Sequence, residues 1–431
     1  MYLLYNLLQI LLLPILAPLL LLSLGRTKYR IRLGKRLGVG LSALWRQQSA
    51  GGQKGPPVIW IHALSVGETT SALPLVRLLR EQYPDGQLVF TVTTRAGEQL
   101  ARKRIGPYVD ILFPSPLDLQ FTIRHFIRTL QPHLFILVET DFWPNWLFTL
   151  QRKNIPALLV NGRVSKDSVR MYRRFPWFFT PLFSAFSLLF MQTRQDAENM
   201  KALGVAPQTV CVLGNLKADM AVSNLDNHQA NLMLKKQYNL PENKLIWICG
   251  STHGDEEQYI LSAYEQLVMT TQLTLIIAPR NIKRAEEICV LGKKMGFRTA
   301  KRSEPTSMAV YDILILDTIG ELARLYQVAD LVFIGGSLVP RGGHNPLEAA
   351  AHGKPIIFGP YMDDFSEIAA GLVQCGGGRQ ITTPIELTTF LRHLIQAPNK
   401  RVTMGRHARE WMLVESGTGE RLLEKIKDFL P

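Results

Sequence analysis

Short continuous runs of apolar residues recur along most of the chain, separated by stretches in which apolar and polar positions follow a helical spacing. Such runs are typical of parallel strands, because crossover helices cover both faces of a parallel sheet. The alternation predicts an α/β fold of two doubly wound, Rossmann-like domains. The runs in the first half are 58–63, 88–93, 111–113, 134–138, 157–160 and 188–191, with a short one at 210–213, and those in the second half are 245–249, 273–278, 312–316, 331–334 and 355–358.

A polar region near the middle of the chain interrupts these runs and marks a boundary between two domains. We expect the first domain at 58–218, an interdomain linker at 219–244, the second domain at 245–410 and a C-terminal helix at 411–431. In doubly wound sheets, ligands bind outside the carboxyl ends of the strands. The expected site is therefore a cleft between the two domains.

The N-terminal segment 1–25 has no charged side chain and is rich in Leu and Ile, with Pro14 and Pro18 interrupting it. Basic residues follow at once, in a flank and linker at 26–57. A secretory signal peptide has the opposite order, with its positive charge before the apolar run. The order predicts an uncleaved membrane anchor with its basic flank on the cytoplasmic face. A helix packed on its own domain is the alternative, as is insertion from one side of the bilayer.

Composition adds information mainly about partners. The formal net charge of +14 predicts an anionic partner, which is a nucleic acid, an acidic lipid surface or a phosphorylated substrate. Basic residues at 163–174 precede aromatic residues at 175–179, a pattern that suits single-stranded nucleic acid or a phosphorylated lipid at a membrane. The predicted anchor favours a membrane surface with anionic lipid and argues against nucleic acid. A solvated helix face is the alternative.

Charged side chains follow several strands of the first half. Glu68 starts a helix after the first strand, where a carboxylate can accept a proton from a substrate hydroxyl and the helix N-terminus keeps it ionised. Glu139 and Asp141 follow the strand at 134–138, where one of them can stabilise a positively charged sugar centre. Lys217 follows a short strand and can meet a carboxylate or a phosphate. For each, the alternative is helix capping, packing or a surface position without chemistry.

The second half contains a glycine-rich stretch, 335–350, between a strand and a helix start. Backbone N–H groups there can face an anion, and Arg341 and His344 add side-chain donors. Asn345 is expected as the N-cap, and Glu348 as an acceptor for ribose hydroxyls. The stretch predicts a nucleotide site, and an ordinary strand–turn–helix connection is the alternative.

Other strand ends of the second half carry polar residues as well. Arg280 follows the strand at 273–278 and can pair with a phosphate. The segment 249–257 contains His253 and three acidic residues, which could suggest a metal site. Acidic residues in the first turn of a helix are ordinary partners of the helix dipole, so we expect no metal there.

Together these motifs resemble the 3-deoxy-D-manno-octulosonic acid (Kdo) transferases of lipopolysaccharide synthesis. The resemblance covers nearly the whole chain, and the glycine-rich stretch 335–350 is its most specific part. It is carried by residues 65–69, 139–145, 251–253, 278–280, 318–322, 335–337 and 342–351.

The resemblance implies a GT-B glycosyltransferase at the cytoplasmic face of the cell inner membrane. It implies an N-terminal acceptor domain, a C-terminal domain that binds CMP-Kdo, and a last helix that returns to the first domain. The implied reaction is inverting, metal-independent transfer of Kdo to the phosphorylated lipid A precursor, lipid IVA, without a cofactor. The implied catalytic residues are Glu68 as base, with Glu139 and Lys217 assisting, and the implied CMP-binding residues are Pro279, Arg280, Ile319, Gly320, Glu321, Asn345, Pro346, Leu347 and Glu348.

The chain departs from the family pattern at a few motif edges. Asp141 stands where a second Glu is usual, Asn281 stands where His is common, and His253 is followed by Gly254 and Asp255 in a less familiar order. These differences concern contacts with the acceptor and the donor. Two other functions stay open, a different GT-B enzyme such as a nucleotide-sugar epimerase and a non-enzymatic protein that binds acidic lipid.

Overall fold

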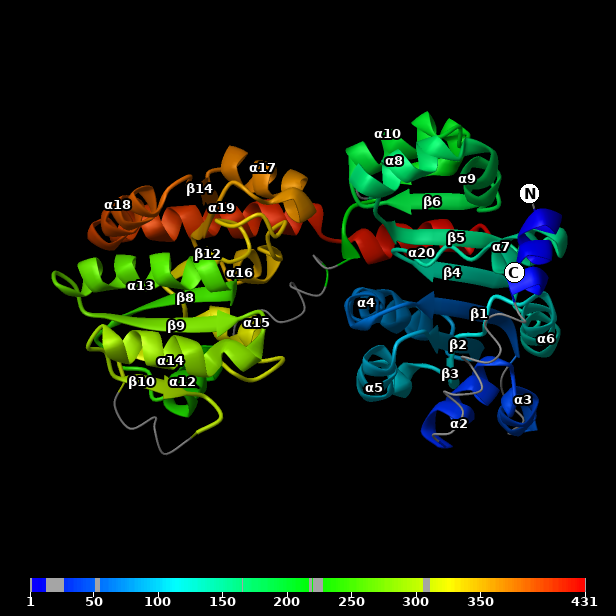
Figure 1. Cartoon of the computed structure of the whole chain (residues 1–431), viewed down its shortest axis with the longest axis horizontal. Helices are drawn as coiled ribbons and strands as arrows, with labels where there is room; N and C mark the ends of the chain where they lie inside the picture. Colours follow the sequence, from blue (N-terminus) through cyan, green and yellow to red (C-terminus); the bar gives the residue numbers. More distant parts are fainter. Residues whose placement is uncertain are drawn as a thin grey trace. The chain divides into compact units, whose positions relative to one another are not determined.

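The computed structural model in Figure 1 describes residues 2–12, 27–50, 55–164, 166–216, 219, 228–304 and 311–430. The chain forms two compact units, Met1–Met220 together with Gly417–Pro431, and Ala221–Ser416. Each unit is built on a seven-stranded sheet, and Figure 1 shows helices on both sides of each sheet.

The sheet of the first unit has the strand order β3-β2-β1-β4-β5-β6-β7, and the neighbouring strands are parallel. The chain winds outward from β1 to β3 and then back past β1 to β4, which is the doubly wound arrangement. The strands are β1 (Gly55–Ala63), β2 (Gly86–Val92), β3 (Ile111–Pro114), β4 (Leu134–Val138), β5 (Ala157–Gly162), β6 (Leu188–Met191) and β7 (Val210–Val212). The helices are α2 (Thr27–Arg36), α3 (Leu41–Ala50), α4 (Val66–Gln82), α5 (Arg95–Arg104), α6 (Gln120–Leu130), α7 (Pro144–Arg152), α8 (Lys166–Arg174), α9 (Pro176–Phe183), α10 (Arg194–Ala202) and α20 (Thr418–Lys427).

The sheet of the second unit has the order β10-β11-β9-β8-β12-β13-β14 and is also parallel. Its strands are β8 (Leu245–Thr252), β9 (Leu273–Pro279), β10 (Thr299–Lys301), β11 (Ile313–Ile315), β12 (Leu331–Ile334), β13 (Ile356–Phe358) and β14 (Gly378–Gln380). Its helices are α12 (His228–Gln237), α13 (Gly254–Val268), α14 (Ala285–Lys294), α15 (Leu322–Leu325), α16 (Leu347–Ala351), α17 (Ser366–Gln374), α18 (Pro384–Gln396) and α19 (Pro398–Glu415). The prediction of two parallel-sheet α/β domains is confirmed.

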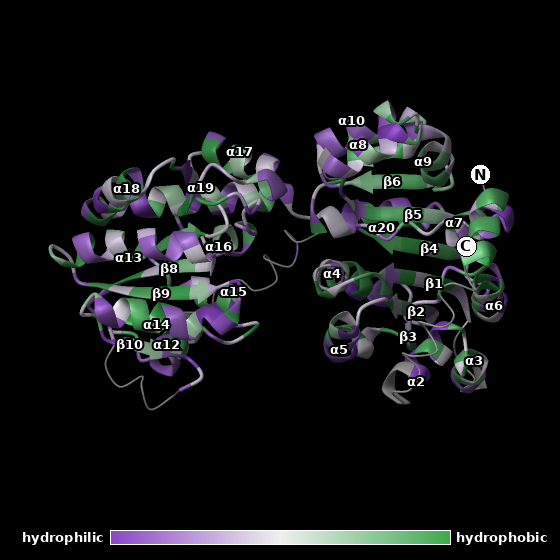
Figure 2. Ribbon diagram, viewed as in Figure 1, coloured by the Kyte–Doolittle hydropathy of each residue, from purple (hydrophilic) through white to green (hydrophobic). Residues whose placement is uncertain are grey.

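The central strands form because both of their faces are buried, and Figure 2 shows β4, β5 and β9 mainly in the green of hydrophobic residues. In β1, Trp60 packs into the core on one face of the sheet, while Ile59 and Ile61 pack into the core on the other. Trp60 lies against the ring of Trp146 from α7, with 5.1 Å between the ring centroids. Each strand of this kind removes apolar surface from water on two sides.

Residues 2–12 are helical, and their polar side chains face the first unit. The Tyr5 hydroxyl donates to Asp118 at 2.8 Å, and the Asn6 amide donates to Asn145 at 2.9 Å. Within the described part of the chain, we find no helix with the length and apolar character needed to cross a bilayer. The rest of the predicted anchor, residues 1 and 13–25, lies outside the described residues.

The last helix, α20, packs against α4 of the first unit. The Asp219 carboxylate accepts hydrogen bonds from the backbone N–H groups of Gly417 and Gly419, at 2.7 and 2.6 Å. Leu422 and Ile426 of this helix are fully buried in the same core as β1. The second unit is therefore inserted, in sequence, between β7 and the final helix of the first unit.

Candidate active site

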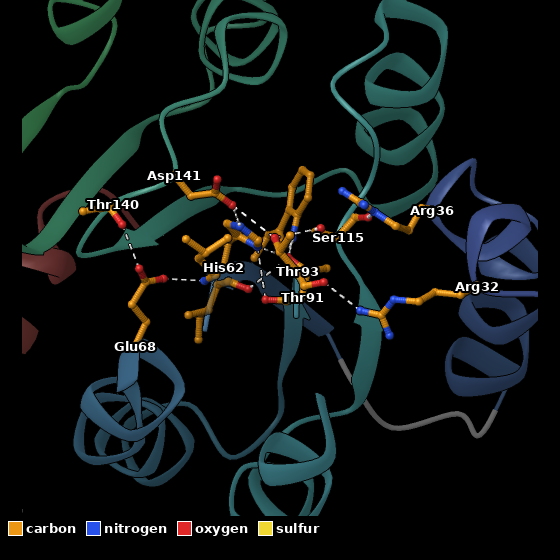
Figure 3. Close-up of polar contacts among 12 residues, drawn as sticks. Arg32, Arg36, His62, Glu68, Thr91, Thr93, Ser115, Thr140 and Asp141 are labelled. Atoms are coloured by element: carbon orange, nitrogen blue, oxygen red, sulfur yellow. Dashed lines mark hydrogen bonds and ion pairs between the residues drawn. The ribbon is translucent and has the colours of Figure 1, made fainter. Parts of the chain in front are cut away.

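Glu68 lies in the first turn of α4, directly after the carboxyl end of β1. Ser65 caps this helix, with its hydroxyl oxygen 3.5 Å from the Glu68 backbone nitrogen. The Glu68 carboxylate accepts hydrogen bonds from the Leu64 backbone N–H and, at 2.8 Å, from the Thr140 hydroxyl (Figure 3). These two donors hold the carboxylate in one orientation at the edge of the sheet.

Burial controls the protonation of Glu68, which is only 4% exposed. Burial raises its pKa from 4.5 to about 8, against the hydrogen bonds from Leu64 and Thr140, and the charges of Glu139 and Asp141 raise it further. The expectation that the helix N-terminus keeps Glu68 ionised is wrong, because burial outweighs the dipole and the two donors. A carboxyl group with a pKa near 8 is a suitable proton acceptor at neutral or slightly basic pH.

The segment after β4 turns sharply, and its backbone places two carboxylates in different surroundings. Glu139 and Asp141 have positive φ values of 62° and 88°, in the left-handed region that side chains rarely adopt. The Glu139 carboxylate accepts hydrogen bonds from the Ser71 hydroxyl at 2.6 Å and from the Asn161 amide at 3.0 Å. Backbone strain of this kind is typical of functional sites.

Asp141 belongs to a network that the sequence did not reveal. Its carboxylate lies 2.9 Å from Nε2 of His62 and accepts a hydrogen bond from the Thr93 hydroxyl at 3.1 Å (Figure 3). His62 is fully buried, and its other ring nitrogen lies 3.1 Å from the carbonyl oxygen of Thr91. The signal in the sequence was the histidine itself, since a polar ring in a strand buried on both faces requires polar partners.

Lys217, the third predicted catalytic residue, lies outside the described residues. The residue before it is held in the same region as Glu139, because the Asn161 side-chain oxygen accepts a hydrogen bond from the Leu216 backbone N–H at 3.1 Å. Asn161 thus contacts both Glu139 and the segment that leads to Lys217.

In the second unit, the predicted nucleotide-binding residues follow neighbouring strands of one sheet. Pro279 ends β9 and is followed by Arg280, which is exposed. The segment 319–321 follows β11, and the segment 345–348 follows β12. Because β11, β9, β8 and β12 are adjacent and parallel, these segments lie at the same edge of the sheet.

The segments 319–321 and 345–348, which are expected to hold CMP, have the following local geometry. Ile319 is 85% exposed, Gly320 has a φ of 90°, and Glu321 forms an ion pair with Arg302 at 3.4 Å. The expectation of Asn345 as the N-cap is wrong, because Pro346 holds that position in α16, although the Asn345 side-chain oxygen accepts a hydrogen bond from the Leu347 backbone N–H at 3.1 Å. This helix begins at Leu347, one residue later than expected.

The backbone amides of the glycine-rich loop bind a carboxylate of the same chain. The fully buried Glu256 carboxylate accepts hydrogen bonds from the backbone N–H groups of Gly336, Ser337 and Leu338, at 2.7, 2.9 and 2.8 Å. These three amides of the stretch 335–350 therefore face a carboxylate of the chain itself and not a bound ligand. Their function in this structure is to compensate the buried charge of Glu256 and to fix the loop to α13.

Two histidines pair beside this loop. Nε2 of His253 lies 3.0 Å from Nε2 of His344, and the rings are stacked with centroids 5.3 Å apart. Burial, together with the charges of Arg280 and His253, lowers the pKa of His344 to about 4. His344 is thus neutral at physiological pH, so the positive charge beside it comes from Arg280. No group of three or more His, Cys, Asp or Glu side chains within the described ranges is placed to hold a metal ion.

Comparison with known proteins decides the family. A family model described as 3-deoxy-D-manno-octulosonic-acid transferase matches residues 32–220. The Kdo transferase of Haemophilus influenzae is 32% identical over 95% of this chain and 94% of its own length. This chain belongs to the Kdo transferase family. It is a glycosyltransferase of lipopolysaccharide core biosynthesis, and the Kdo transferase of Chlamydophila psittaci is 30% identical over 87% of the chain and 86% of its own length.

Solved structures show how this Kdo transferase family member shares its fold with other enzymes. The UDP-GlcNAc 2-epimerase of Neisseria meningitidis aligns with 86% of this chain and 100% of its own, with a TM-score of 0.62. The sequence identity is 12%, so the similarity concerns the fold alone. The same two-domain α/β architecture therefore supports different chemistry in the two families.

Proposed function

We propose that this enzyme transfers Kdo from CMP-Kdo to a phosphorylated lipid A precursor, lipid IVA, with inversion at the anomeric carbon. Glu68 is the general base of this reaction. The observation that carries the proposal is the buried Glu68 carboxylate, which Leu64 and Thr140 orient and whose pKa is about 8.

The reaction is a single displacement in this proposal. Glu68 accepts the proton of an acceptor hydroxyl while the hydroxyl oxygen forms a bond to the anomeric carbon of Kdo. The bond from that carbon to the CMP phosphate breaks, and the electron pair leaves with CMP. Attack from the side opposite to CMP inverts the configuration. Glu139, fixed by Ser71 and Asn161, and Lys217 assist the charge redistribution.

The donor half of the proposal rests on the loops of the second unit. Arg280 follows β9 and meets the CMP phosphate, and the segments 319–321 and 345–348 hold the nucleotide. Arginine forms strong charge-assisted hydrogen bonds to phosphate, which supports a leaving group stabilised without a metal ion. The two units act as the acceptor and donor domains of a GT-B enzyme.

The lipid acceptor also requires a place at a membrane. The helix at 2–12 contacts the first unit through polar side chains, while Leu3, Ile10 and Leu11 are 81, 66 and 61% exposed. The Tyr5 ring lies 6.3 Å from the ring of Phe178 in α9, next to the exposed Trp177. These apolar groups support insertion into the cytoplasmic face of the inner membrane, which contains anionic lipid.

The test is Kdo transfer from CMP-Kdo to lipid IVA, followed by mass spectrometry, in the wild type and in Glu68→Gln. We expect the variant to lose about 10²- to 10⁴-fold in rate, as is usual for a missing general base, and to retain CMP-Kdo binding. Glu81→Gln is the matched control, because Glu81 is an exposed carboxylate on the same helix. Wild-type rates in Glu68→Gln would remove Glu68 from the base role.

A further inference from the structure

A basic pocket with a volume of about 200 Å³ lies between α2, α5 and the end of β3. Its walls include Arg32, Lys35, Arg95 and Arg102, with Glu98 and Pro114. The sequence placed Arg32 and Lys35 in the basic flank of a membrane anchor. In the folded chain these two residues line a pocket of the first unit together with α5.

The pocket has an excess of positive charge. Four cationic side chains line it against the single carboxylate of Glu98, and that carboxylate is shared between Arg32 and Arg102. Although burial opposes it, hydrogen bonds and charge from these two arginines hold the pKa of Glu98 below its usual value. Burial and the charge of Arg32 lower the pKa of the neighbouring Arg36. An anion entering the pocket would reduce this repulsion.

A short series of hydrogen bonds connects the pocket to the carboxylates of the site. Arg32 donates to the Thr93 carbonyl oxygen at 2.7 Å, and the Thr93 hydroxyl donates to Asp141 at 3.1 Å (Figure 3). Arg36 donates to the Ser115 carbonyl oxygen at 3.1 Å, one residue after the pocket-lining Pro114. The pocket therefore lies at the same carboxyl edge of the sheet as Glu68.

The geometry points to this pocket as the site that binds a phosphate monoester of the lipid acceptor and thereby orients the acceptor hydroxyl toward Glu68. This inference rests on the proposed function. Arginine and lysine side chains converging on one concave surface suit a dianionic group, to which arginine can donate two parallel hydrogen bonds. The volume is below the ~300–1,000 Å³ of pockets that enclose whole drug-sized ligands, so it suits one charged group of a larger molecule.

The experiment compares the acceptor with a matched acceptor from which the phosphates have been removed, both in neutral detergent micelles. Equilibrium binding and the KM of transfer are measured for the wild type, Lys35→Gln, Lys35→Arg and the control Lys103→Gln. Lys103 is exposed on α5 and does not line the pocket. We expect Lys35→Gln to weaken binding and raise KM by about 5- to 10-fold for the phosphorylated acceptor alone, with kcat unchanged. Lys35→Arg and Lys103→Gln should resemble the wild type.

Three results would overturn the inference. One is an equal effect of Lys35→Gln on both acceptors, which indicates a structural role, and another is no effect on either. The third is that Lys35→Gln binds more weakly to vesicles of anionic phospholipid but keeps the wild-type preference for the phosphorylated acceptor. That result would mean that the basic side chains of the pocket bind the bilayer surface. Failure of the proposed function is recognised separately, as absence of Kdo transfer by the wild type, because acceptor binding is measured without turnover.

Discussion

The protonation of Glu68 depends on opposing influences of its immediate surroundings. Two hydrogen-bond donors and a helix N-terminus favour the carboxylate, whereas burial and the neighbouring charges of Glu139 and Asp141 favour the neutral acid. The balance gives a pKa of about 8. A residue of this kind is a stronger base than an exposed glutamate, and its ionised fraction changes most around pH 8.

The pH dependence of transfer should report this pKa. We expect kcat/KM for the acceptor to increase with pH from 6, to be half-maximal at about pH 8 and to level off above that pH, because protonated Glu68 cannot accept the hydroxyl proton. The measurement is the initial rate at low acceptor concentration and saturating CMP-Kdo, from pH 6 to 9.5. A profile that is already level at pH 6 would contradict a raised pKa.

The same shift predicts a change in stability. Between about pH 4.5 and 8 the folded protein keeps a proton on Glu68 that the unfolded chain has released, so this contribution to the free energy of unfolding is full below pH 4.5 and is lost as the pH rises to 8. Glu68→Gln carries no ionisable group there. We expect its stability relative to the wild type to increase from pH 5 to 8, by on the order of 1–3 kcal/mol. Thermal unfolding at both pH values measures the difference, and a constant difference would contradict the prediction.

At the scale of elements, a loop of the second unit is fixed by a helix that precedes it in the sequence. Glu256 of α13 accepts hydrogen bonds from three backbone amides of the loop after β12 and a fourth from the His253 backbone N–H, at 3.0 Å. The loop conformation therefore depends on a side chain 80 residues earlier in the sequence. Rigid positioning of this kind keeps the neighbouring residues that we propose to bind the nucleotide in place.

Replacing Glu256 should loosen that loop. Glu256→Gln places an amide N–H₂ group where the carboxylate accepts hydrogen bonds, leaving buried donors unsatisfied. We expect a loss of about 2–4 kcal/mol in stability and weaker CMP binding. Differential scanning fluorimetry and calorimetric titration with CMP test this, with the exposed Glu265→Gln on the same helix as control. Unchanged melting and affinity would show that the three amide contacts do not matter.

Much of the element pattern could be predicted from the sequence. Three strands begin and end where their apolar runs do, because a strand that is buried on both faces has apolar residues at every position. They are Leu134–Val138, Leu188–Met191 and Leu331–Ile334. β10 and β14 were missed, since each is a three-residue strand with polar residues at the margin of the sheet, and pairing with one neighbour stabilises it. The contact of Glu256 with Gly336 and the burial of Glu68 arise from tertiary packing, which local patterns do not contain.

At the scale of the whole molecule, the first unit is assembled from both ends of the chain. Its core contains Leu216, just after β7, together with Leu422 and Ile426 of α20, all fully buried. Asp219 binds the backbone amides at the start of this segment. The final helix is thus a structural part of the unit that contains Glu68.

Deletion of residues 417–431 should therefore destabilise the first unit selectively. Loss of buried Leu422 and Ile426 exposes their partners on α4 and in the sheet, at about 2–5 kcal/mol for each large aliphatic side chain. Hydrogen exchange followed by mass spectrometry should show faster exchange in β1 and β4, with β8 and β12 as the internal control. Equal acceleration in both sheets, or none, would contradict this assignment.

The position of α20 also has a consequence for synthesis on the ribosome. Most of the first unit emerges early, yet the helix that completes its core is translated only after the whole second unit. A nascent chain holds an unfinished hydrophobic surface until this helix has been made, and such surfaces recruit chaperones and proteases. A chain that terminates early therefore lacks a finished first unit and is a substrate for degradation.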